Sequence, residues 1–319
     1  MFCPSFRRRA AALALSALIA ASWFTPAFAA EAKDGERREA FLAELSALPH
    51  YREDRAGRYL AYLGSKQYTP EQVLRIVNTD ADLPPYQDMA ETDVSYGVLM
   101  LANKHNFLGD YEPEDLEELG ECGSWGSMAK EARDAFAALT EAAAEDGMHI
   151  WGVSPYRSFE RQRAIYNRYV AKNGQRAADT YSARPGSSEH QTGLAVDVAV
   201  RGRSYNTFGG TKEDGWMREH AHEFGFILRY DRGMDYITGY MYEPWHYRYV
   251  GVDAATYIWE HELTFEEYYY YYVVGGESPE AAETEEAADT PDEAQTEPAA
   301  QPAEPTLASY FRDYWGKLP

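Results

Sequence analysis

A short stretch of the chain, SSEHQTGLAVDV at residues 187–198, places an imidazole and a carboxylate seven positions apart. The apolar residues after Gly193 predict the start of a buried strand. A neutral histidine and an ionised aspartate are both good ligands for a divalent metal ion. If the chain turns at Thr192 and Gly193, the side chains of His190 and Asp197 can meet at one ion. Two ligands do not complete a zinc site, so the third must come from another part of the chain.

A second motif, EPWH at residues 243–246, supplies the groups that the first one lacks. His246 is the candidate third ligand, and Glu243 is the candidate general base. Three protein ligands leave the fourth tetrahedral position open, which is typical of catalytic rather than structural zinc. Zinc activates a water molecule, and a nearby carboxylate can take its proton during attack on a carbonyl. The proline in the motif predicts an extended segment, not the helical His-Glu-x-x-His arrangement.

Arg157 follows a predicted strand and is a candidate clamp for a substrate carboxylate or a developing oxyanion. Spacing alone leaves the three-ligand site and a chance arrangement both open, because His-x6-Asp and Glu-x-x-His pairs are common. The other histidines are interpreted as core, edge, helix-end or surface residues: His50, His105, His149, His220, His222 and His261.

The first 30 residues predict a secretory signal peptide. They combine three arginines at positions 7–9, an Ala- and Leu-rich run and a small-x-small pattern at residues 27–29. We therefore expect an exported protein in the cell wall, periplasm or medium, with anchoring by an uncleaved signal as the alternative. Cleavage would remove three arginines and no acids and change the net charge from −22 to −25. Such acidity argues against nucleic acid or an anionic membrane as partner. Cys122 would then lack a disulfide partner, and we do not expect it to be a nucleophile.

Hydrophobic periodicity predicts the elements between the signal peptide and residue 273. Residues 31–77 are expected to be helical, with a helix beginning at Thr69 and Pro70. Further helices are expected over residues 128–146, 159–172, 216–223, 254–260 and 265–272. Strands are expected over residues 98–103, 150–153 and 224–230 and in the second half of 243–250.

The C-terminal region changes character abruptly. Residues 274–306 are acidic and poor in apolar side chains, which predicts a disordered linker. Residues 307–319 then place apolar side chains along one helical stripe. We expect this amphipathic helix to dock on a protein surface, either this domain or another envelope component, in preference to a membrane.

Several motifs together closely resemble the VanY-type D-alanyl-D-alanine carboxypeptidases, subfamily B of zinc peptidase family M15. They are SPYRSFERQ at 154–162, PGSSEHQTGLAVD at 185–197, GFILRY at 225–230, TGY at 238–240 and EPWHYRYVG at 243–251. The resemblance covers roughly residues 70–272. It implies an α+β fold of the hedgehog and D-Ala-D-Ala-peptidase type, in which helices flank a small antiparallel sheet.

The resemblance also implies roles for individual residues. His190, Asp197 and His246 would bind one zinc ion, Glu243 would be the general base, and Arg157 would stabilise the oxyanion or grip the peptide. Positions that line the substrate site in relatives correspond to Gln162, Ser188 and Trp245. One departure is Pro155, where the family usually has glycine, so the loop that follows the strand is expected to differ slightly.

These observations predict a helical extension at residues 31–97 and a zinc peptidase domain at residues 98–273. The expected reaction is removal of the terminal D-alanine from peptidoglycan stem peptides. An L,D-carboxypeptidase acting on tetrapeptide stems is the nearest alternative, because pocket shape decides chirality. A wall-binding module without turnover is the alternative from another class. It predicts that a metal ligand or the general base is missing, but His190, Asp197, His246 and Glu243 are all present.

Overall fold

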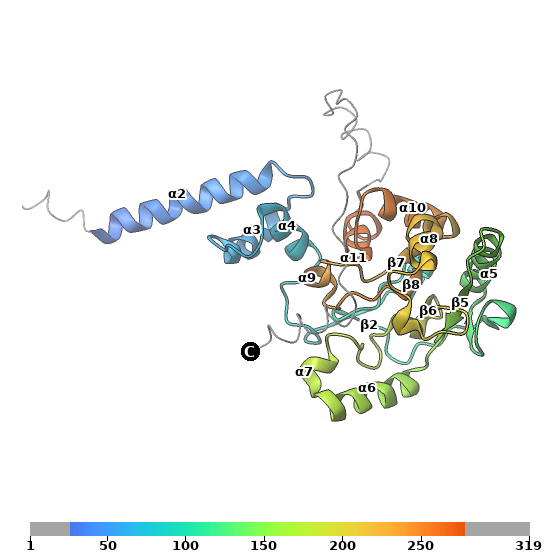
Figure 1. Ribbon diagram of the computed structural model, residues 1–319. Coiled ribbons are helices and arrows are strands. Elements are labelled where there is room, and N and C mark those ends of the chain that lie inside the picture. Colours follow the sequence, from blue (N-terminus) through green and yellow to red (C-terminus); the bar gives the residue numbers. More distant parts are fainter. Residues whose placement is uncertain (1–25, 278–319) are drawn as a thin grey trace, which may run out of the picture. The chain divides into compact units, whose positions relative to one another are not determined.

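The computed structural model describes residues 26–277 (Figure 1). Most of the predicted signal peptide, the acidic linker from residue 278 onward and the predicted C-terminal helix at 307–319 lie outside the described residues. The chain divides into two compact units after Asn78, upstream of the domain start predicted at residue 98. In the described part of the chain, no helix has both the length and the apolar character that a membrane span requires.

Ten α-helices lie within the described range. They are α2 Pro26–Ser46, α3 Ala56–Tyr59, α4 Pro70–Asn78, α5 Lys130–Glu145, α6 Phe159–Asn173, α7 Gln175–Ala178, α8 Lys212–His220, α9 Asp235–Thr238, α10 Val252–Glu260 and α11 Phe265–Tyr268. The strands are β1 Ala90–Glu91, β2 Asn106–Phe107, β3 Leu116–Glu118, β4 Ser127–Ala129, β5 Ile150–Val153, β6 Ala195–Val200, β7 Phe226–Leu228 and β8 His246–Tyr249.

The first unit is helical, as the sequence predicts. Helix α4 begins where expected, because Thr69 and Gln72 cap it reciprocally: the Thr69 hydroxyl accepts from the Gln72 amide at 3.2 Å, and the Gln72 side chain accepts from the Thr69 amide at 3.0 Å. The unit has a small apolar core of its own, formed by Leu45, Tyr59, Val73, Leu74 and Val77.

The second unit is built on a four-stranded antiparallel sheet with the strand order β5-β6-β8-β7. In the view of Figure 1, α10 and α11 lie above the strands of this sheet and α6 and α7 lie below them. The predicted α+β fold is therefore confirmed. Val196 and Val198 of β6 and Tyr247 of β8 belong to a core that includes Phe136 of α5. Because side chains alternate along a strand, the intervening residues of β6 and β8 face the opposite side.

The strand expected at residues 98–103 is wrong. The structure has a 3-10 helix over Val94–Leu99, and the residues that follow are irregular although Leu101 is fully buried. Side chains satisfy the backbone there in place of a strand partner. The Arg248 guanidinium donates to the carbonyls of Val98 at 2.9 Å and Met100 at 2.8 Å, and the Thr92 hydroxyl donates to that of Leu101. A short apolar run is buried in either conformation, so its composition could not separate them.

The other predicted elements of this unit are present. Strand β5 has the predicted bounds, and the boundaries of most of the others are shifted. Helix α8 begins earlier than expected because the Thr211 hydroxyl accepts from the Asp214 amide and caps it. Strand β7 begins only at Phe226, since a 3-10 turn and Gly225, with φ of +79°, precede it. A Cβ atom on Gly225 would lie 2.7 Å from the Tyr249 ring, so the turn requires glycine.

Candidate metal centre and active site

Two of the predicted ligands are direct partners across the centre of the sheet. Asp197 of β6 lies opposite His246 of β8 in the antiparallel ladder. Opposed residues project from the same face with their Cβ atoms about 4.5–5.5 Å apart. The Asp197 Oδ1 atom accordingly lies 3.3 Å from His246 Nδ1. The hydrogen-bonded register of the sheet thus sets the separation of these two ligands.

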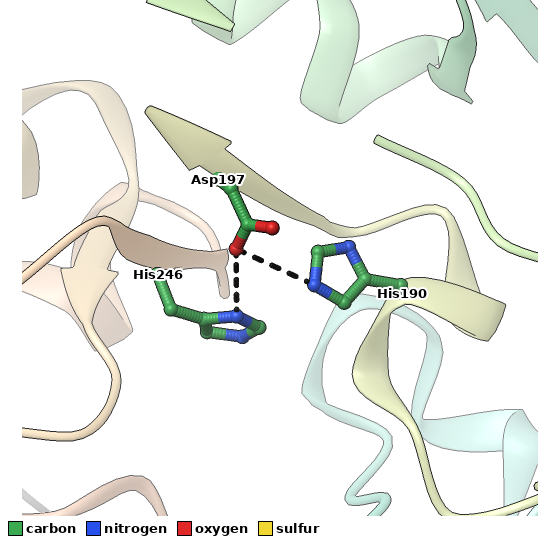
Figure 2. A group of neighbouring side chains, drawn as sticks. All are labelled: His190, Asp197 and His246. Atoms are coloured by element: carbon green, nitrogen blue, oxygen red, sulfur yellow. Dashed lines mark ion pairs between the residues drawn. The ribbon is translucent and has the colours of Figure 1, made fainter. Parts of the chain in front are cut away.

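A tight turn brings the third predicted ligand to the same place. The 3-10 turn Glu189–Thr192 ends at Gly193, whose φ is +73°. A Cβ atom on this glycine would lie 2.9 Å from the backbone nitrogen of Ala129, so a larger residue does not fit. His190 therefore points back toward β6, with its Nε2 atom 3.5 Å from Asp197 Oδ1 (Figure 2).

The chemistry of this donor set fits a zinc ion. The three side chains are buried, and their ligand atoms lie within 4.8 Å of one another. His190 Nδ1 lies 3.0 Å from the Pro155 carbonyl and can donate its proton there, which leaves Nε2 as an electron-pair donor. Asp197 Oδ1, which both rings face, has no hydrogen-bond partner within residues 26–277. Converging donor atoms in a buried site repel one another unless a cation lies between them.

Glu243 stands beside the three ligands in the turn before β8. Its Oε2 atom lies 4.0 Å from His246 Nδ1, and its backbone amide donates to the Tyr230 carbonyl at 3.0 Å. Burial raises the pKa of Glu243 to about 8, and the Asp197 carboxylate adds to this effect, whereas His246 and Arg157 oppose it. A divalent cation at the three ligands would oppose this rise, as His246 and Arg157 do. A carboxylate with a raised pKa is suited to take a proton near neutral pH.

Arg157 is held at the other side of the ligand cluster. Its Nη2 atom donates to the Ser154 hydroxyl at 2.7 Å and lies 3.8 Å from Asp197 Oδ2. Its Nη1 atom donates to the Gln162 side-chain carbonyl at 2.7 Å. The Gln162 amide group in turn donates to the Ala183 carbonyl at 2.6 Å. Gln162, predicted to contact substrate, therefore has both ends of its side chain engaged, and its contacts fix the Arg157 guanidinium.

The proline that departs from the family pattern lies in the loop that carries these groups. The Pro155 carbonyl faces His190, so the loop holds a metal ligand as well as Arg157. A Cβ atom on Gly126 would lie 2.6 Å from the Pro155 ring. Glycine at position 126 thus provides the space that the proline occupies.

The site opens into a cleft of about 730 Å³. The three candidate ligands, Glu243 and Arg157 all line it, as do Gln162 and the two other predicted substrate residues, Ser188 and Trp245. Trp245 packs edge-on against Tyr205, with ring centroids 5.3 Å apart. The structure therefore brings all eight residues singled out in the sequence to one cleft.

The chain is similar to several known proteins. A family profile described as VanY, D-alanyl-D-alanine carboxypeptidase, matches residues 126–252. The putative carboxypeptidase YodJ of Bacillus subtilis is 41% identical over 181 residues, which are 54% of this chain and 66% of that protein. The solved LdcB LD-carboxypeptidase has 38% sequence identity and a TM-score of 0.54, over 57% of this chain and 90% of that one. The chain belongs to the VanY family of zinc peptidases.

The VanY match contains all eight site residues, whereas the N-terminal helical unit lies outside it. A D-alanyl-D-alanine carboxypeptidase of Enterococcus faecalis is also 42% identical over 139 residues, which are 41% of this chain and 51% of that protein. The chain thus spans from about half to about two thirds of these two curated relatives. Membership of the VanY family is thus established for the peptidase domain. The predicted resemblance to this family and the predicted zinc cofactor are confirmed.

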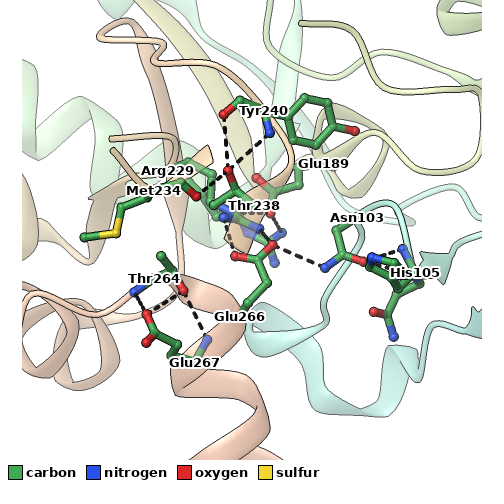
Figure 3. Close-up of polar contacts among 12 residues, drawn as sticks. Asn103, His105, Glu189, Arg229, Met234, Thr238, Tyr240, Thr264, Glu266 and Glu267 are labelled. Carbon is green, nitrogen blue, oxygen red and sulfur yellow. Dashed lines mark hydrogen bonds and ion pairs between the residues drawn. The ribbon is translucent and has the colours of Figure 1, made fainter. Parts of the chain in front are cut away.

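Behind the VanY centre, a buried network of charges contacts His246. Figure 3 shows three of its members, Glu189, Arg229 and Glu266. His246 Nε2 lies 3.3 Å from Glu189 Oε2, and Glu189 Oε1 accepts from Arg229 Nε at 2.8 Å. Arg229 also donates from both terminal nitrogens to Glu266 of α11, at 2.8 and 2.5 Å. Burial favours the neutral acid, but Arg229, His246 and Arg248 hold the pKa of Glu189 well below its usual range. An ionised Glu189 can accept the outer proton of His246 and orient the ring.

Motifs and spacing assign no metal-binding, catalytic or substrate-binding role to Glu189, Arg229 or Glu266. One signal was present: Arg229 follows the apolar residues Phe226 to Leu228. A charged residue at the end of a buried strand requires a partner. Its partner Glu266 lies 37 positions later in the chain, so the spacing of motifs does not reveal the pair.

Proposed function

We propose that this chain is a zinc-dependent D-alanyl-D-alanine carboxypeptidase that removes the terminal D-alanine from peptidoglycan stem peptides. The observation that carries the proposal is the placement of Glu243 beside the cluster His190, Asp197 and His246, in a cleft that Arg157 also lines. The family description and the name of the Enterococcus faecalis relative support the D,D assignment. Since peptidoglycan lies outside the cytoplasm, the proposal includes export by the predicted signal peptide.

Each residue has a distinct task in this reaction. When bound, zinc supplies a Lewis acid for the scissile carbonyl and for water. Glu243 takes the proton from the attacking water and can pass it to the leaving amine. Arg157 offers a buried cation, held by Ser154 and Gln162, to the negative charge that develops in the transition state or to the C-terminal carboxylate of the substrate.

A second candidate function is L,D-carboxypeptidase activity on tetrapeptide stems. The likeness to the LdcB LD-carboxypeptidase, with a TM-score of 0.54, favours it. The two activities require the same metal centre and differ in the chirality of the residue before the scissile bond. The residues that choose between them therefore belong to the cleft wall rather than to the metal centre.

The deciding experiment offers pentapeptide and tetrapeptide stems to the zinc-loaded protein and weighs the products by mass spectrometry. Loss of D-alanine from the pentapeptide supports the proposal. Loss from the tetrapeptide alone overturns it in favour of the second candidate.

A second measurement tests the role of Glu243. Glu243→Gln is isosteric and cannot accept the proton, so we expect kcat to fall by about 10²–10⁴-fold. Zinc content should be retained, because Glu243 is not among the three ligands. Substantial residual turnover would refute the general-base assignment, and absence of turnover in the unaltered protein would favour the wall-binding alternative.

A further inference from the structure

One wall of the cleft extends well beyond the metal centre. Helix α6 contributes Gln162, Ile165, Arg168, Tyr169, Lys172 and Asn173 to the cleft lining. These positions recur at the three- and four-residue spacing of a single helix face. From Gln162 to Lys172 the helix rises about 15 Å, at about 1.5 Å per residue. An extended peptide covers that distance in roughly four to five residues, at about 3.3 Å each.

The outer part of this wall is fixed by aromatic and polar contacts. Tyr169 of α6 packs edge-on against Tyr181, with centroids 5.1 Å apart. The side-chain amide of Asn173 donates to the Tyr181 hydroxyl at 2.6 Å. Tyr181 itself lines the cleft, so two sides of the groove are joined at its far end.

Arg168 and Lys172 stand four positions apart on this helix face, both exposed at the cleft. Like charges at this spacing destabilise a helix. Among residues 26–277, no carboxylate forms an ion pair with either of them, whereas Arg163 on the outward face pairs with Glu160. The helix dipole favours a cation at Lys172 in the last turn, but its effect fades before Arg168.

Charge in the cleft is divided along its length. The carboxylates that line it are Glu189, Asp197 and Glu243, and all three lie at the metal centre. The outer part carries two cations on a protein whose net charge is −22. Clefts lined by one sign of charge concentrate ligands of the opposite sign.

We propose that Arg168 and Lys172 form a subsite for a carboxylate that the substrate carries three to five residues before its C-terminus. This inference rests on the proposed function and names the substrate more closely. In a stem pentapeptide, the γ-linked glutamyl residue lies three positions before the terminal D-alanine, and its α-carboxylate is either free or amidated. The subsite selects stems in which this carboxylate is free, because a carboxamide cannot form a charge-assisted contact with either cation.

The test compares two pentapeptide stems that differ only at this group, one with the free carboxylate and one with the carboxamide. We expect the unaltered protein to prefer the free acid by about tenfold in kcat/KM, through KM. In Arg168→Gln/Lys172→Gln the ratio should fall to about one. Arg163→Gln on the outward face of the same helix should keep the tenfold ratio. A double variant that keeps the preference, or an unaltered protein that has none, overturns the proposal.

Binding separates this inference from the proposed function. Titration of zinc-loaded Glu243→Gln with each peptide measures affinity without turnover. Tighter binding of the free acid, lost when the Arg168 and Lys172 substitutions are added, supports the subsite even if neither peptide is hydrolysed. Equal binding of the two peptides overturns the subsite while leaving the proposed hydrolysis intact.

Discussion

The sheet side of the site, behind the metal centre, and the helix wall of the cleft differ in how their charges are arranged. On the sheet side, Glu189, Arg229 and Glu266 are buried and paired at hydrogen-bonding distance. On the helix side, Arg168 and Lys172 are exposed and have no carboxylate partner among the described residues. Buried pairs hold a geometry, at the cost of desolvating the charges. Exposed charges without a carboxylate partner do not fix the positions of neighbouring side chains, but they are available to a ligand.

The largest effect should come from disrupting the buried charge network on the sheet side. Arg229→Met leaves Glu189 and Glu266 buried without their main cation, so we expect a loss of about 3–5 kcal/mol in the free energy of unfolding. Urea unfolding of the metal-free protein measures it. Adding Glu266→Gln should recover part of the loss, since one uncompensated carboxylate disappears. A double variant less stable than Arg229→Met alone would contradict this account of the network.

A matched pair of variants separates positioning from stability on the same side. Glu189→Gln and Glu266→Gln each remove one carboxylate from Arg229, but only Glu189 contacts His246. We expect Glu189→Gln to weaken zinc binding by about 10–100-fold, as loss of a group that orients a ligand does. Competition with a chelator of known affinity measures this. Equal zinc affinities in the two variants would show that Glu189 does not position His246.

Between the two sides, Gln162 joins α6 to the loop that carries Arg157. Gln162→Leu removes the acceptor of Arg157 Nη1 and leaves the Ala183 carbonyl without its donor. Unsatisfied buried groups cost about 1–3 kcal/mol, so we expect kcat/KM to fall by about tenfold or more. Gln162→Glu keeps the acceptor and should lose less activity. An equal loss in both variants would argue that Arg157 does not depend on this contact.

The smallest effect should come from salt, which tests the difference between exposed and buried charges without a mutation. Raising ionic strength from about 0.02 M to about 0.3 M shortens the screening length and weakens exposed charges more than buried ones. We expect kcat/KM for an anionic stem to fall about threefold, while kcat at saturating substrate changes little. A fall in kcat as large as that in kcat/KM would place the salt sensitivity at the metal centre instead.

The sequence predicted the metal centre better than it predicted what surrounds it. His190, Asp197 and His246 lie in short motifs whose residue types carry their chemistry, and Gly193 marks the turn between two of them. Arg229, Glu266 and Arg248 could not be assigned, because the pairing of a buried charge depends on contacts far apart in the chain. Arg248 also explains why the strand predicted over residues 98–103 is wrong. Its guanidinium binds the carbonyls of Val98 and Met100, which in a strand would accept from the amides of a neighbouring strand.

The ladder pairing of Asp197 with His246 has a consequence for how such enzymes diverge. Hydrogen bonds between β6 and β8 fix the distance between the two ligands, so the number of residues between them in the chain is free to change. Insertions and deletions in that interval can reshape the cleft without disturbing the metal. A slip of one residue in the pairing would instead turn one ligand to the wrong face. Distant relatives are therefore better recognised by strand register than by the spacing of their motifs.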